Sequence, residues 1–162
     1  MSLFDKFGEF DSFGEINELA ENLFNEGDLK SIRILAKENG IPDEFVELYL
    51  EGEIPVLCDA MTAAVGKLDV EAQEMKIKGL MLDWVDYVKA QCQENQILAY
   101  KVRSKGKSLA GCIAELLKVS FGDQWTVPKE ILKEAKITAS KVTFGVPDMG
   151  TAKEIIKEYY AG

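Results

Sequence analysis

Apolar side chains recur at three- and four-residue spacing through most of this chain, which is the pattern of amphipathic helices. In the first third, the pattern predicts three short helices that each stop at a glycine. They carry Ile16 to Phe24 before Gly27, Leu29 to Ala36 before Gly40, and Phe45 to Leu50 before Gly52. Four spaced phenylalanines before the first helix, between Phe4 and Phe13, predict an N-terminal arm that packs down onto it.

The rest of the chain repeats the helical pattern with one weak stretch. Residues 57–65 have one apolar side, residues 66–77 are less periodic and predict a loop with a turn of helix, and residues 78–93 predict the longest helix. Further helices are expected after Ser108, after Pro128 and over 152–159. Residues 136–146 alternate like a strand but are too short and isolated to form a sheet. The predicted fold class is all-α, a compact bundle of short helices.

The second and third predicted helices have the spacing of a helix-turn-helix. Ala36 permits close helix approach, Gly40 makes the turn, and Val46 and Leu50 pack the second helix. We therefore expect residues 1–53 to form an acidic three-helix subdomain and residues 54–162 a helical subdomain with a basic C-terminal part. One continuous domain is the open alternative.

Charge is unevenly distributed along the 162 residues, whose net charge is −9. Residues 1–53 hold 14 Asp or Glu against 4 Lys or Arg, whereas residues 96–162 hold 7 acidic and 11 basic residues. Two interpretations are open: the two ends attract each other, or they meet partners of different charge. In the second, the acidic end competes with nucleic acid for a basic groove on another protein.

The residue types favour a binding protein over an enzyme. Histidine is absent, which removes the commonest general base and metal ligand, and only carboxylate chemistry stays open. Cys58, Cys92 and Cys112 lack metal-ligand spacing and suit buried thiols in a reducing compartment. No secretory signal or membrane span is apparent. We expect a cytoplasmic protein without catalytic residues, cofactor or metal; a homo-oligomer is possible.

The acidic residues of the third predicted helix are the first candidate site. A DNA-reading helix needs basic and amide side chains, and four carboxylates would instead repel DNA. They suit a site on another protein that normally holds a phosphate backbone, although a solvated helix face is the simpler explanation. The candidate partner-binding residues are Asp43, Glu44, Glu47 and Glu51.

A basic run in the middle of the chain is the second candidate site. Four cations within seven residues are able to touch the phosphates of RNA or DNA, but no aromatic side chain stands among them. The run is otherwise a solvated connector or a docking strip for the acidic half. The candidate residues are Lys101, Arg103, Lys105 and Lys107.

One segment resembles a known family. Residues 105–118, KGKSLAGCIAELLK, followed by VPKEI at 127–131, are similar to the central motif of PcfK-like proteins of conjugative and other mobile elements. Some of these are described as inhibitors of the CRISPR nuclease Cas9. The resemblance implies a mobile-element or phage accessory protein that binds a CRISPR effector, or its guide complex, and blocks nucleic-acid loading or target binding. The alternative is a nucleic-acid-binding accessory factor of conjugation or plasmid maintenance.

Overall fold

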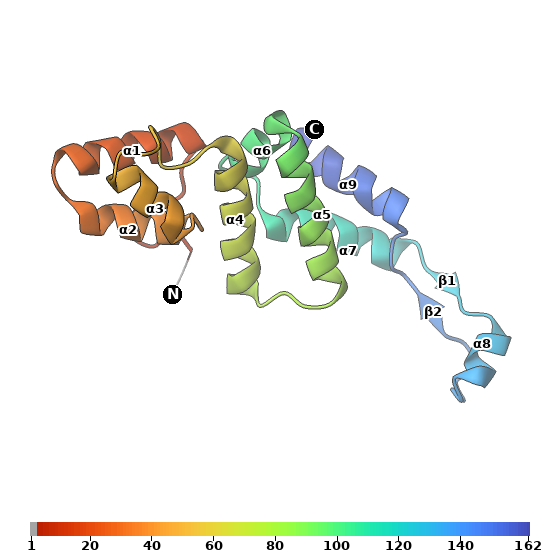
Figure 1. Ribbon diagram of the computed structural model, residues 1–162. Helices are drawn as coiled ribbons and strands as arrows, with labels where there is room; N and C mark the ends of the chain where they lie inside the picture. The colour runs from red at the N-terminus through yellow and green to blue at the C-terminus, as the bar shows by residue number, and fades with distance from the viewer. Residues whose placement is uncertain (1–2) are drawn as a thin grey trace. The chain divides into compact units, whose positions relative to one another are not determined.

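The computed structural model describes residues 3–162 and confirms the all-α fold class, with one two-stranded sheet added (Figure 1). The elements are α1 (Phe13–Asn25), α2 (Leu29–Glu38), α3 (Asp43–Leu50), α4 (Ala60–Met75), α5 (Leu80–Glu94), α6 (Gln96–Arg103), α7 (Leu109–Gly122), β1 (Trp125–Thr126), α8 (Lys129–Glu134), β2 (Thr143–Phe144) and α9 (Met149–Ala161).

The chain divides into two compact units, and the division falls between Ala110 and Gly111. The first unit runs to Ala110 and includes Ala161; the second contains Gly111 to Tyr160 and Gly162. This division differs from the boundary that the three short helices predicted at residue 53. The reason is packing, because Leu57, Cys58 and Ala63 belong to the same core as the three N-terminal helices.

The three N-terminal helices form where the sequence predicts them, and α1 and α2 each begin at a capping side chain. Ser12 caps α1 and Asp28 caps α2, the Asp28 carboxylate accepting the Ser31 N–H at 3.1 Å. Their apolar faces meet in one core, against which Phe7 and Phe10 of the N-terminal arm pack, as expected, together with Phe13 at the start of α1. The buried members from α1, α2 and α3 include Ile16, Ala20, Leu23, Ile32, Leu35, Ala36 and Val46.

The turn between α2 and α3 packs directly on the backbone of α4. Gly40 has a left-handed φ of +67°, which glycine adopts without strain. A Cβ added there would lie 2.2 Å from the Gly66 carbonyl oxygen, and one added to Gly66 would lie 2.3 Å from the Asn39 carbonyl oxygen. Two glycines therefore allow the predicted helix-turn-helix to approach α4 closely.

Helix α4 corrects two expectations. It continues without interruption to Met75, where the sequence indicated a loop over 66–77, and its 16 residues exceed the 15 of α5, which was expected to be the longest helix. The apolar period fails in its second half because Gly66, Lys67 and Glu71 occupy buried positions there. A buried helix face made of glycine and charged residues is invisible to hydrophobic periodicity.

The second unit is built on α7 and α9. Gly111 of α7 lies against Tyr159 of α9, where an added Cβ would be 2.2 Å from the tyrosine hydroxyl oxygen. Between these helices in the sequence, β1, α8 and β2 form an extension that Figure 1 shows beyond their ends. The strands are antiparallel, and the ladder continues with the Val127 N–H donating to the Val142 carbonyl at 2.9 Å.

The two-stranded sheet corrects the expectation that residues 136–146 form no sheet. Only two residues of each strand pair, and the paired residues lie 17 and 19 positions apart in the chain. Such a short ladder leaves little local pattern to detect. Within residues 3–162, no helix combines the length and the apolar character needed to span a membrane.

Candidate partner-binding surface

Helix α3 presents all four predicted carboxylates on one side. Each is exposed, and Glu51 keeps right-handed helical backbone angles (φ −81°, ψ −7°) just past the end of the helix. At about 100° and 1.5 Å per residue, Asp43, Glu44, Glu47 and Glu51 fall within an arc of about 100° and about 12 Å of helix axis. This density of about one charge per 3–4 Å matches the roughly 3.4 Å per phosphate along one DNA strand. We call these four residues the acidic face.

Three of the four carboxylates also have a local structural role. Asp43 and Glu44 lie in the first turn of α3, where the helix dipole favours negative charge. Glu47 pairs with Arg33 of α2; both side chains are about half-exposed, and the arginine holds the pKa of Glu47 below its usual value. Glu51 stands at the opposite, electronegative end of the helix, where a carboxylate is unfavourable. Helix stability therefore does not account for Glu51.

A hollow beside α1 and the C-terminal end of α3 adds to the acidic character of this unit. Its volume is about 550 Å³, and Glu18, Glu21, Phe24, Tyr49 and Val56 are among its lining residues. Phe24 and Tyr49 pack with ring centroids 5.8 Å apart. The pKa of Tyr49 is raised mainly by burial and further by the negative charge of Glu21. The hollow has carboxylates and aromatic rings but no basic side chain in its lining.

The basic run is not the exposed strip that the sequence indicated. Arg103 is 0% exposed, so its expected contact with nucleic acid is wrong. Lys101 and Lys107 are partly buried, and only Lys105 is exposed. The run is divided between the last turn of α6 and the turn that follows it. Arg103 follows Ala99 by four residues on α6, and both lie on the buried side of that helix.

Arg103 belongs instead to a buried polar cluster that sequence reasoning missed. Its guanidinium donates to the Asn39 side-chain oxygen at 2.8 Å and to the Phe10 carbonyl at 3.3 Å. It therefore joins α6 to the N-terminal arm and to the α2–α3 turn. Burial lowers the pKa of Arg103, and the carboxylate of Glu9 is the largest opposing influence.

Lys67 is the second buried cation of this cluster. Its ammonium pairs with Glu9 at 2.9 Å and donates to the carbonyls of Ser104 at 2.9 Å and Lys107 at 2.5 Å. One turn further along α4, the Glu71 carboxylate accepts the Leu109 N–H at 2.7 Å. Burial lowers the pKa of Lys67 and raises that of Glu71. These contacts fasten the segment 104–109 to α4, so the cluster is a structural device of the first unit.

The three cysteines are buried, as expected. Burial raises the pKa of both Cys58 and Cys92 to about 12, which leaves almost no reactive thiolate at neutral pH. Among residues 3–162, no group of three or more His, Cys, Asp or Glu side chains is arranged to hold a metal ion.

Comparisons with protein-family models, with curated proteins and with solved structures find no match to this chain.

Proposed function

We propose that this protein binds a CRISPR effector nuclease, alone or with its guide, through the acidic face and so blocks nucleic-acid loading or target binding. The acidic face takes the place of a phosphate backbone in a basic groove of the effector. The similarity of residues 105–131 to PcfK-like proteins directs the choice of effector to Cas9.

The observation that carries the proposal is the charge spacing on α3. Four exposed carboxylates lie along about 12 Å of helix axis at unequal intervals of about 1.5, 4.5 and 6 Å, and their mean density is close to that of phosphates along one strand. A groove whose lysines and arginines are placed for phosphates would meet several of these carboxylates at once. The charge of Glu51 opposes the helix dipole, which fits selection for a partner better than selection for the helix.

The charge distribution supports the same mechanism over a longer range. Residues 1–53 carry 14 acidic and 4 basic side chains, an excess of ten negative charges. Such a field accelerates encounter with a basic groove and weakens as salt screens it. Binding should therefore be tightest at low ionic strength.

The test removes charge without changing side-chain shape. The triple variant Asp43→Asn, Glu44→Gln, Glu51→Gln keeps the Arg33–Glu47 ion pair, so α2 and α3 remain tied together. A labelled target DNA is then cleaved by a Cas9–guide complex in the presence of each protein. We expect native protein to inhibit cleavage and the triple variant to lose most of that inhibition.

A matched control separates the acidic face from net charge. The variant Asp83→Asn, Asp86→Asn, Glu94→Gln also removes three negative charges, all from exposed positions on α5. We expect it to inhibit like the native protein. Equal inhibition by both triple variants would contradict the proposed mechanism, and circular dichroism would check that each remains helical.

The alternative function, a nucleic-acid-binding accessory factor of conjugation or plasmid maintenance, depends on the basic run together with the basic C-terminal part of the chain. Because Arg103 is buried, Lys105 is the one exposed cation of the basic run, all of which lies within the described residues. A single lysine supplies too little charge for nucleic-acid binding at this position.

A further inference from the structure

An exposed pair of aromatic rings stands on the two-stranded sheet of the second unit. Trp125 and Phe144 are direct partners across the strands, and their rings stack at 5.5 Å between centroids with 24° between planes. Even so, Trp125 remains 53% exposed and Phe144 50% exposed. Rings of this size normally bury most of their surface, so a stacked pair left half in solvent offers open ring faces to a ligand.

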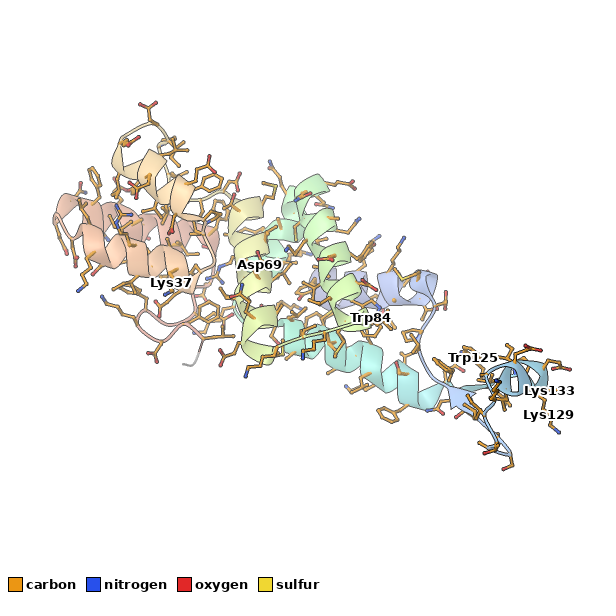
Figure 2. All side chains as sticks on the ribbon, turned by 60° about the horizontal axis from the view of Figure 1, so that its bottom comes forward. Lys37, Asp69, Trp84, Trp125, Lys129 and Lys133 are labelled. Carbon is orange, nitrogen blue, oxygen red and sulfur yellow. The ribbon has the colours of Figure 1, made fainter. Side chains whose placement is uncertain are left out.

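Lysines accompany the aromatic pair. Lys129 and Lys133 are one helical turn apart on α8, and Figure 2 places both in the same extension as Trp125. Residues 123–148 hold four lysines and four acidic residues, so this segment has no net charge in a chain whose net charge is −9. We call residues 123–148 the aromatic arm. It combines cations with stacking surfaces, which the basic run at 101–107 lacks.

We propose that the aromatic arm binds single-stranded nucleic acid. Unpaired bases stack on the open faces of Trp125 and Phe144, and the Lys129 and Lys133 ammonium groups meet the neighbouring phosphates. Aromatic side chains beside a basic path are the usual means of holding single strands without reading their sequence. A duplex keeps its bases stacked on each other, so only the two terminal base pairs offer a free face to these rings.

A protein partner fits the arm less well. Cores of protein interfaces are enriched in aromatic residues but depleted in lysine, whereas here lysines lie four and eight residues after Trp125. The arm also lies in the second unit, whereas the acidic face belongs to the first. The inference is therefore independent of the proposed inhibitor function, and either can fail without the other.

The experiment measures direct binding to defined probes. Full-length protein is titrated against fluorescein-labelled oligothymidine and oligouridine of about 15 nucleotides, with a blunt duplex of equal length alongside, by fluorescence anisotropy at rising NaCl concentrations. We expect both single strands to bind more tightly than the duplex. The two single-stranded probes distinguish DNA from RNA as the source of the ligand.

Variants assign the binding to the arm. Trp125→Ala should weaken single-strand binding by about fivefold or more, whereas Trp125→Phe, which keeps a ring face, should restore most of it. The double variant Lys129→Ala, Lys133→Ala should make the negative slope of log K against log salt shallower by about 1.4, which is about 0.7 for each lost phosphate contact. Both lysines are exposed, so replacing them should leave the fold of the arm unchanged.

Controls use comparable residues outside the arm. Phe121→Ala removes a ring that is 74% exposed on α7, and Lys78→Ala removes an exposed lysine before α5. Both should bind like the native protein. The inference is overturned if neither single strand binds at low salt, or if the control variants weaken binding as much as the arm variants. Self-association that requires Trp125, without retention of either probe, would also overturn it and identify the arm as a contact between copies.

Discussion

The buried ammonium of Lys67 gives the sharpest stability prediction. Replacing Lys67 with Met keeps a long flexible side chain but removes the charge and all three donors. The Lys107 carbonyl then loses the ammonium donor, and the Ser104 carbonyl keeps only the Lys107 N–H at 3.4 Å. The Glu9 carboxylate, whose side chain is 28% exposed, loses its ion-pair partner.

The magnitude follows from what is left without a partner. A buried acceptor deprived of its hydrogen bond costs about 1–3 kcal/mol, and removing one member of a buried ion pair costs about 3–5 kcal/mol. Because these contributions overlap, we expect Lys67→Met to lower the free energy of unfolding of the first unit by about 3–5 kcal/mol. That is a large part of the about 5–15 kcal/mol typical of a folded domain.

The assay isolates the first unit by its fluorescence. The chain has two tryptophans, so a Trp125→Phe background leaves Trp84, buried in α5, as the one reporter. Urea titration then follows the first unit, and a loss of 4 kcal/mol should move the midpoint by about 2 M if m is about 2 kcal/mol per M. Lys89→Met is the matched control, because Lys89 pairs with Asp69 at 2.7 Å on the surface of α4 and α5.

The two lysines differ in burial, and this difference decides the result. The Lys89 and Asp69 side chains are 29% and 40% exposed, so their pair should contribute no more than about 1 kcal/mol. A Lys67 variant that loses no more stability than the Lys89 variant would refute the structural role assigned to the buried cluster. A more stable Lys67 variant would refute it as well.

Three further predictions test other parts of the structure. Gly66→Ala should destabilise the protein by about 1–3 kcal/mol despite the helix propensity of alanine, because the added Cβ would lie 2.3 Å from the Asn39 carbonyl oxygen in the α2–α3 turn. Gly122→Ala is the control, because its Cβ would meet nothing within 4 Å, and thermal unfolding should show it to be neutral or stabilising. Hydrogen bonds from Ser31 at the start of α2 lower the pKa of Asp28 from its usual value of 3.8, so the ionised carboxylate stabilises the fold above about pH 4. This stabilisation is lost as pH falls through the pKa of Asp28 in the folded protein. Asp28→Asn should therefore flatten the pH dependence of the free energy of unfolding below about pH 4, and an unchanged slope would contradict this. With pKa values of about 12, Cys58 and Cys92 should resist iodoacetamide in the native protein and react once urea unfolds it, as mass spectrometry would record.

The fold could be predicted where one local pattern determines it. The first three helices combine an apolar stripe, a side-chain or proline start and a glycine stop, and these signals agree. The second half of α4 could not be predicted in this way, because Lys67 and Glu71 are buried through partners far along the chain. The sheet also depends on distant residues, since β1 and β2 have two residues each and pair across an intervening helix.

The sites show the same division. The acidic face could be predicted because residues 43–51 form one regular helix, so their spacing alone fixes their common side. Arg103 could not be recognised as a core residue from its basic neighbours, since its burial depends on Asn39 and Phe10, more than 60 residues away. The aromatic arm was missed because Trp125 and Phe144 are separated in sequence and meet only through the strand pairing.

The central claim is that the acidic face competes with nucleic acid for a CRISPR effector. The most direct measurement is retention of labelled target DNA by a Cas9–guide complex, with and without this protein, across a salt series. We expect the protein to displace DNA at low salt and to displace less as salt rises. The triple variant Asp43→Asn, Glu44→Gln, Glu51→Gln should displace little. Undisturbed DNA binding at low salt, or displacement that the triple variant retains, would contradict it.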